Sequence, residues 1–180
     1  MNGIDVSAAD GAIDWAGAYA EGVDFALIRA SVGMAADARF AENIAKAHAA
    51  GIKIGVYHDL YARSAADARA EAVLFLKTIS PVKEKIRLWA ICRAEESFCA
   101  PFAEDFLYEV SANGFAPMAA VPPSVLPQIG ARYPLWLLLW GVPEARALSY
   151  APRIWQYGEG RTSAMPRLRM DRGYFSGMHI

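Results

Sequence analysis

Three acidic residues lie at or near the ends of apolar runs that predict β-strands. Asp5 follows "NGI", Glu95 follows "IRLWAIC" and Asp171 lies within "LRMDRGYF". A single acidic residue in such a place is most often a turn cap or a solvated side chain. Cleavage of a sugar bond, however, needs a cluster of carboxyl groups that donate a proton and stabilise the developing positive charge. These residues are a candidate catalytic set if the fold brings them together.

The elements that must position these carboxylates are eight short apolar runs, each predicting a strand and mostly bounded by Gly, Pro or charged residues. They are residues 2–7, 23–31, 52–60, 86–92, 115–121, 135–140, 153–157 and 168–175. Helical periodicity lies between the first five strands. The clearest segments are 38–50, a helix opened by Ser64 with Asp67, and about 96–112, with Phe98 on its apolar stripe.

Strand and helix alternate five times, and three strands with short connections follow. This order predicts an α/β fold in which a parallel sheet closes as a shortened TIM-like barrel, (β/α)5(β)3, over a single domain of residues 1–180. A doubly wound open sheet is the alternative, but it would carry a Gly-rich phosphate loop that "DVSAADGAIDW" lacks. Functional side chains of such barrels stand at the C-terminal ends of strands. Here these are Asp5, Arg29, Tyr57, Asp59, Arg93, Glu95, Trp155, Gln156 and Asp171.

Composition excludes several classes of function. A net charge of −1 gives no basic surface for nucleic acid, and the run "PLWLLLWGV" is too short to span a membrane. The start "MNGIDVS" has no signal-peptide pattern, so we expect cytoplasmic synthesis. Cys92 and Cys99 lack zinc-site spacing and predict two small buried residues. We therefore expect no metal site and no disulfide. We also expect no cofactor, and we take a monomer as the default.

Seven blocks of the chain, in order, resemble the glycoside hydrolase family 25 lysozymes, the Chalaropsis-type N-acetylmuramidases. They are "GIDVSAADGAIDW", "GVDFALIRAS", "FAENIAKAHAAGIKIGVYHD", "ADARAEAVLFL", "LWLLLWG", "IWQYGEG" and "MDRGYFSG". The resemblance implies the (β/α)5(β)3 barrel and cleavage of the β-1,4 bond between N-acetylmuramic acid and N-acetylglucosamine in peptidoglycan, with retention of configuration. It also implies that Asp5 and Asp171 line the cleft, and that Glu95 is the proton donor of an Asp-x-Glu motif.

The chain departs from the family at that motif, because Arg93 replaces its aspartate. A neighbouring cation lowers a carboxyl pKa, whereas a general acid needs it raised. Positions 93 and 95 point to the same side of a strand, so the guanidinium should share the cleft with Glu95. Asp59 stands where family members carry an aromatic residue, and we expect it to pair with Arg93 across adjacent strands. A register shifted by one residue would instead put Cys92 and Ala94 at the motif positions and predict an inactive site.

Three functions are compatible with these residues. The first is a peptidoglycan hydrolase with Glu95 as acid, Asp5 and Asp171 as catalytic partners, and Tyr57, Asp59, Arg93 and Trp155 as substrate contacts. It would act at the cell wall after release, as a phage lysin or an autolysin. The second is a glycan-binding or structural module that kept the barrel and lost turnover through Arg93. Hydrolysis of another N-acetylated glycan such as chitin is a third reading. Trp140 stands where the family pattern has a tyrosine.

Overall fold

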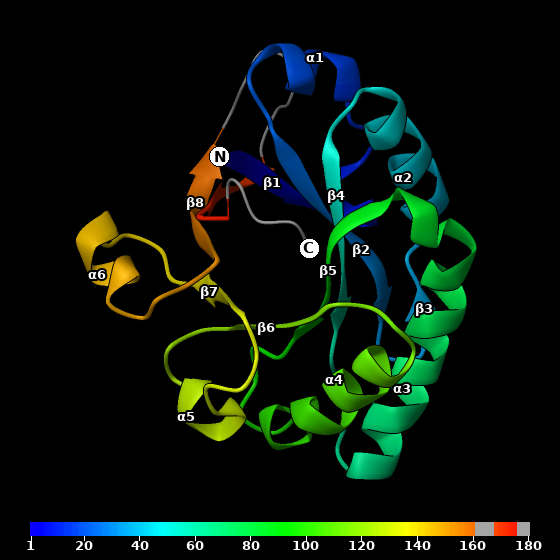
Figure 1. Ribbon diagram of the computed structural model, residues 1–180, viewed down its shortest axis with the longest axis vertical. Helices are drawn as coiled ribbons and strands as arrows, with labels where there is room; N and C mark the ends of the chain where they lie inside the picture. Colours follow the sequence, from blue (N-terminus) through cyan, green and yellow to red (C-terminus); the bar gives the residue numbers. More distant parts are fainter. Residues whose placement is uncertain (161–167, 176–180) are drawn as a thin grey trace.

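The computed structural model describes residues 1–160 and 168–175, and it forms a closed eight-stranded barrel (Figure 1). The barrel strands are β1 (Asn2–Val6), β2 (Phe25–Val32), β4 (Lys53–Asp59), β5 (Ile86–Arg93), β6 (Pro117–Val121), β7 (Leu135–Leu138), β8 (Ile154–Gly160) and β9 (Leu168–Gly173). Their order around the barrel is β1-β9-β8-β7-β6-β5-β4-β2, and pairing of β1 with β2 closes it. A two-residue strand, β3 (Ala35–Ala36), pairs antiparallel with the end of β2. All eight predicted strands and the shortened barrel are confirmed.

The last barrel strand runs against its neighbours. The other seven strands are parallel to one another, whereas β9 is antiparallel to both β8 and β1. Because β8 ends at the mouth, β9 begins there and runs towards the opposite end of the barrel. The residue of β9 that lies beside Asp5 is therefore Arg169. Asp171 comes two residues later, farther from the mouth, and lies beside Gly3.

Helices cover the outer wall unevenly. They are α1 (Trp15–Ala20), α2 (Phe40–Ala49), α3 (Ala65–Ile79), α4 (Ala103–Ala112), α5 (Leu126–Ile129) and α6 (Glu144–Leu148), with 3₁₀ turns at Ala8–Asp10, Ser80–Lys85 and Ala100–Phe102. The longer helices α2, α3 and α4 pack against β2, β4, β5 and β6, and the short α5 and α6 lie on the side of β7 and β8 (Figure 1).

The prediction of a helix from about residue 96 is wrong at its start. Pro101 lies in the first turn of a 3₁₀ segment, and the α-helix proper begins at Ala103. A proline is accepted in a first turn but not inside a helix, so the chain before it adopts a turn. Phe98 is consequently 38% exposed rather than part of a buried stripe.

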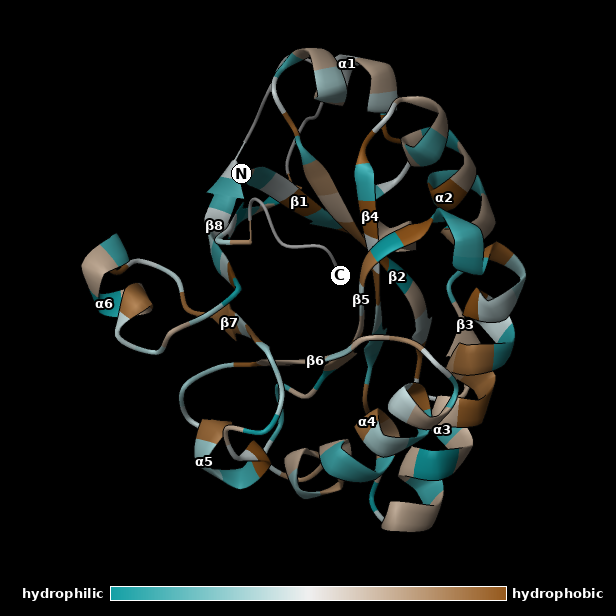
Figure 2. Ribbon diagram, in the orientation of Figure 1, coloured by the Kyte–Doolittle hydropathy of each residue, from teal (hydrophilic) through white to brown (hydrophobic). Residues whose placement is uncertain are grey.

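The core has two layers separated by the sheet. One fills the barrel interior with large side chains, including Phe25, Tyr57, Trp89 and Trp136, and the other lies between the sheet and the helices. In Figure 2 the ribbons of α3 and α4 alternate between brown and teal, as expected for helices with one face on the barrel. Gly3 makes room for the interior, since a Cβ there would lie 2.2 Å from Cζ of Phe25.

An extra residue in β2 sets which side chains face the mouth and which face the helices. Arg29 pairs with Tyr57 and Ser31 pairs with His58, so Ala30 is bulged out of register. Arg29 thereby stays on the mouth side, and the Ser31 hydroxyl lies 2.8 Å from Nδ1 of His58 in the outer core.

The buried imidazole of His58 continues this contact into α3. Its Nε2 lies 2.7 Å from Oε2 of Glu71, and the same oxygen accepts the backbone N–H of Tyr61 at 3.0 Å. A buried carboxylate with two donors ties the loop after β4 to the helix behind it. This loop carries one wall of the cleft.

Candidate active site

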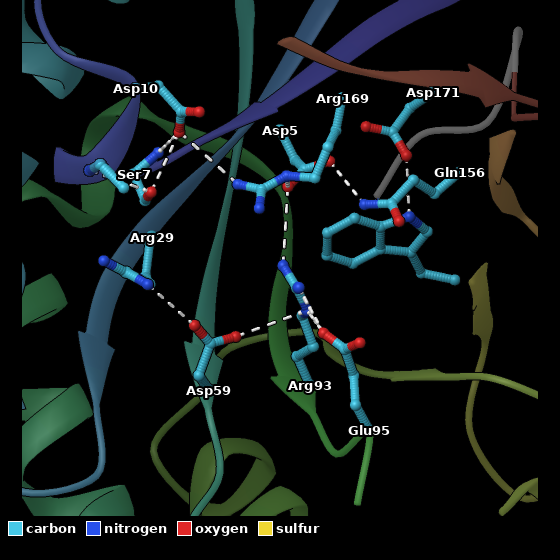
Figure 3. A network of polar contacts seen from close by, with 12 residues as sticks. Asp5, Ser7, Asp10, Arg29, Asp59, Arg93, Glu95, Gln156, Arg169 and Asp171 are labelled. Atoms are coloured by element: carbon cyan, nitrogen blue, oxygen red, sulfur yellow. Dashed lines mark hydrogen bonds and ion pairs between the residues drawn. The ribbon is translucent and has the colours of Figure 1, made fainter. Parts of the chain in front are cut away.

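The floor of the barrel mouth is made by buried polar side chains from three strands (Figure 3). Asp5 from β1, Gln156 from β8 and Asp171 from β9 are all buried. Nε2 of Gln156 donates to Asp5 at 2.7 Å, and Nε1 of Trp136 donates to Asp171 at 2.8 Å. The fold thus brings the two predicted aspartates together, as expected.

Arg169 is a site residue that the sequence analysis missed. Its Nε lies 2.6 Å from Oδ1 of Asp5, and its Nη2 lies 3.5 Å from Oδ2 of Asp10. The assumption that functional residues stand at the C-terminal ends of strands fails for β9, which enters at the mouth with its first residues. Alternation along a strand reversed in this way could have pointed to Arg169.

Arg93 occupies the centre of the mouth (Figure 3). Its side chain is only 12% exposed, and its guanidinium lies 3.6 Å from Asp5, lies 3.5 Å from Asp59 and forms an ion pair with Glu95. The expected pair between Asp59 and Arg93 is present. Asp59 is also held by Arg29, whose Nη1 lies 3.1 Å away while its Nε bonds Asp37 at 2.8 Å.

Glu95 is the accessible carboxylate among the three predicted catalytic residues. Its side chain is 46% exposed, whereas Asp5 and Asp171 are buried. Arg93 and Glu95 both turn to the cleft, and the alternative motif residues Cys92 and Ala94 lie in the core behind the sheet. This placement agrees with the register that puts Glu95 at the acid position. The catalytic roles of Glu95, Asp5 and Asp171 stay predictions.

Burial shifts the pKa values of the charged side chains at the barrel mouth. Desolvation, and then the charge of Asp5, raise the pKa of Asp171 well above its usual value. Burial also raises the pKa of Asp5, against the opposing effect of Arg169 and Arg93. Burial works to lower the pKa of Arg93, but the surrounding anionic groups raise it overall. Arg93 is therefore a permanent cation at the mouth.

Two of the predicted substrate contacts are buried. Tyr57 lies in the barrel interior, with the Arg93 guanidinium 5.4 Å from its ring centre, and its hydroxyl finds no hydrogen-bond partner among the described residues. Trp155 lies in the outer core and donates through Nε1 to the carbonyl of Leu139 at 2.7 Å. Substrate contact by Tyr57 and Trp155 stays a prediction. The aromatic residues open to solvent beside the cleft are instead Tyr61 and Trp140.

Two cavities meet at Glu95. The first, called here the Tyr61 cavity, has a volume of about 230 Å³ and is lined by Asp59, Leu60, Tyr61, Arg93, Glu95 and Glu96. The second, the Trp140 cavity, has a volume of about 350 Å³ and is lined by Arg93, Glu95, Pro122, Leu138, Trp140, Gln156, Glu159 and Arg169. Arg93 and Glu95 belong to both, so they form the boundary between two halves of one cleft.

Other kinds of site find little support in residues 1–160 and 168–175. No cluster of His, Cys, Asp and Glu within these ranges could hold a metal ion. Cys92 and Cys99 are free thiols in the core, and burial raises the pKa of both, which opposes a nucleophilic thiolate. None of the helices in the described part of the chain has the length and apolar character needed to cross a membrane.

Comparison with solved structures shows the same fold. The CTP1L endolysin superposes with a TM-score of 0.82 at 22% identity, over 96% of this chain and 66% of the endolysin. The lysozyme of Streptomyces coelicolor gives 0.77 at 23% identity, over 98% of this chain and 93% of the lysozyme. The catalytic domain of endolysin ply40 from Listeria monocytogenes bacteriophage P40 gives 0.82 at 18% identity, over 96% and 92%. This chain thus spans slightly less than two thirds of the first of these proteins.

The family comparison covers most of the sequence. No curated protein matches the chain. The model of glycosyl hydrolases family 25 matches residues 4–164, a range that begins beside Asp5 and includes Glu95. Asp171 follows the matched range, and the last two residues of the block "MDRGYFSG" lie outside the described residues. The chain belongs to glycosyl hydrolases family 25 and is by family a glycoside hydrolase.

Proposed function

We propose that this protein is a peptidoglycan muramidase that cleaves the β-1,4 bond between N-acetylmuramic acid and N-acetylglucosamine. Glu95 is the proton donor, and Asp5 and Asp171 form the floor beneath the reacting sugar. The protein works as a monomer at the bacterial cell wall. Family membership supports hydrolysis of peptidoglycan in general, and the neighbouring folds include an endolysin, a phage catalytic domain and a bacterial lysozyme.

The observation that carries this proposal is the position of Glu95. It is the exposed carboxylate of the predicted set, two residues after the end of β5 and on the boundary of the two cavities. A general acid must reach the leaving oxygen of a bond whose two sugars lie on either side of it. A glycan lying across both cavities would bring one such bond to Glu95.

The same site explains why turnover should be slow. Arg93 forms an ion pair with Glu95, so Glu95 must leave this partner before it can reach the leaving oxygen of a glycosidic bond. The transition state of glycoside cleavage resembles an oxocarbenium ion, so it gains from nearby negative charge. Asp5 could supply that charge, but guanidinium groups at 2.6 Å and 3.6 Å already neutralise it.

A second candidate is a glycan-binding module without turnover. The specific observation that favours it is that Arg93 contacts Asp5, Asp59 and Glu95 at once, so each of these three carboxylates has a cationic partner. A site disabled in this way can keep its scaffold and its cleft.

Dye release from labelled bacterial cell walls separates the two candidates. The parent protein is compared with Glu95→Gln, which is nearly isosteric and cannot donate a proton, and with Arg93→Asp, which restores the family motif. Release by the parent that disappears in Glu95→Gln and rises in Arg93→Asp supports a slow muramidase. Wall binding without release by the parent supports the module. Mass spectrometry of the products tests the bond, because N-acetylmuramic acid at every new reducing end is required, and N-acetylglucosamine there would contradict a muramidase.

A further inference from the structure

We propose that Tyr61 and Trp140 are the two sugar-binding platforms of the cleft, one on each side of Glu95, and that they hold an N-acetylated glycan independently of turnover. The identity of the glycan rests on the proposed function. The two-sided geometry rests on the cavities, which are separate except for the residues they share at Arg93 and Glu95.

Tyr61 is held in place by its backbone and leaves its ring open. The ring belongs to a residue that is 56% exposed, in the loop that follows β4. Its N–H donates to the buried carboxylate of Glu71 at 3.0 Å, so the loop does not depend on the ring for its position. The ring centre lies 6.4 Å from that of Phe98, which the Arg63 guanidinium covers at 4.9 Å. An exposed aromatic ring fixed in this way is a surface ready for a ligand.

Trp140 is anchored at one edge. Its Nε1 donates to Oε1 of Gln156 at 2.9 Å, and Nε2 of Gln156 donates in turn to Asp5. The hydrogen bond satisfies the polar edge of the indole, while 46% of the residue remains exposed. Among the described residues it is the exposed tryptophan, since the other four are buried. Because the indole ring is already held by Gln156 and is open to solvent, a ligand that packs on it causes little further loss of side-chain entropy.

The chemistry of each cavity matches a saccharide. A pyranose ring presents C–H groups on its faces and hydroxyl groups around its edge. The Tyr61 cavity offers an aromatic ring beside Asp59, Glu95 and Glu96. The Trp140 cavity offers an indole beside Gln156, Glu95 and the two arginines. Apolar surface with a few convergent polar groups fixes the orientation of such a ligand, whereas a purely apolar ligand would leave these polar groups unpaired.

Charge argues for a largely uncharged sugar rather than a small anion. The guanidinium groups at the mouth are paired with Asp5, Asp10, Asp59 and Glu95, so little net positive charge is left to attract an incoming anion. Hydroxyl and acetamido groups can bond to these charged side chains without breaking the pairs. The rings of Tyr61 and Trp140 then supply the contact area.

Fluorescence tests this proposal without any need for hydrolysis. Because the other tryptophans are buried, acrylamide quenching reports on Trp140. The probes are chitotetraose and a soluble peptidoglycan tetrasaccharide, titrated against the Glu95→Gln protein so that no turnover occurs. We expect both to shield Trp140 from acrylamide, and Tyr61→Ala and Trp140→Ala each to weaken binding, measured by calorimetry, roughly 2- to 12-fold.

Tyr19→Ala is the matched control, since Tyr19 is also 56% exposed but lies on α1. It should leave the dissociation constants unchanged, and circular dichroism with thermal unfolding verifies that all variants fold. Unchanged affinity in both Tyr61→Ala and Trp140→Ala overturns the proposal. The proposal also fails if the Glu95→Gln protein binds neither probe. If binding behaves as expected but dye release is absent, the muramidase proposal fails while the platforms stand.

Discussion

Replacing Arg93 by methionine tests whether the charged mouth stabilises the fold. Arg93→Met keeps most of the side-chain volume and removes a guanidinium that is 12% exposed. At separations near 3.5 Å, each ion pair with Asp5 and Asp59 corresponds to about 5 kcal/mol of Coulomb energy at an effective dielectric constant of ~20. Desolvation of the partners offsets much of this gain.

The net effect on stability depends on which cationic partners Asp5 and Asp59 retain once Arg93 is replaced. Removing one partner of a buried pair typically costs about 3–5 kcal/mol because the other charge is left uncompensated. Here Asp5 keeps Arg169 at 2.6 Å and Asp59 keeps Arg29 at 3.1 Å, while Glu95 is free to turn to solvent. We therefore expect Arg93→Met to lower the free energy of unfolding by about 1–3 kcal/mol at neutral pH.

Urea unfolding followed by tryptophan fluorescence measures this change, with equal slopes required for the comparison. The matched control is Arg39→Met, which breaks an exposed i, i+3 pair with Glu42 and should cost at most about 0.5 kcal/mol. If Arg93→Met leaves the protein equally stable or makes it more stable, desolvation exceeds the attraction, and the claim that the ion pairs stabilise the mouth is wrong.

Three further perturbations follow from the buried groups. Burial and the charge of Asp5 raise the pKa of Asp171 above 3.8, so between that value and its raised pKa the folded state binds one proton more than the unfolded chain. The free energy of unfolding should therefore fall as pH rises across that window, by up to ~1.4 kcal/mol per pH unit. Denaturation series from about pH 4 to pH 8 measure this fall, and Asp171→Asn should flatten it. A slope that stays the same in the variant would show that Asp171 is not the group responsible. Glu71→Leu removes the acceptor of two buried donors, so we expect a loss of about 2–4 kcal/mol in urea unfolding, and Glu71→Gln, which keeps one carbonyl acceptor, should lose less. Gly3→Ala places a Cβ 2.2 Å from Cζ of Phe25 and should cost about 1–3 kcal/mol, part of which Phe25→Leu should restore in thermal unfolding; no restoration would mean that the clash lies elsewhere.

The strands of this fold are predictable because each is a compact apolar run with polar punctuation, and burial on both faces of a barrel requires such runs. The helix ahead of Ala103 was predicted too long because Phe98 continues the helical period of Phe102 and Phe106. Periodicity does not report that Pro101 confines the chain before it to a turn.

The candidate site was predictable in its residues more than in its contacts. Asp5, Arg93 and Glu95 were found because parallel strands deliver their last residues to the mouth. Arg169 was missed because the direction of a strand is set when the sheet closes, and the apolar pattern of residues 168–175 does not show that β9 runs against its neighbours. Tyr61 was missed because its exposure depends on Glu71, a partner ten residues away on α3.

The extra residue at Ala30 serves two parts of the protein at once, the cleft and the core behind the sheet. With it, Arg29 faces Asp59 in the cleft while Ser31 faces His58 behind the sheet. Shortening β2 by this residue would reverse the facing of one neighbour or the other, so a single deletion would break either the ion pair of Arg29 with Asp59 or the contact of Ser31 with His58. In homologous chains, substitutions at the position of Ala30 should therefore be tolerated more readily than deletions or insertions there.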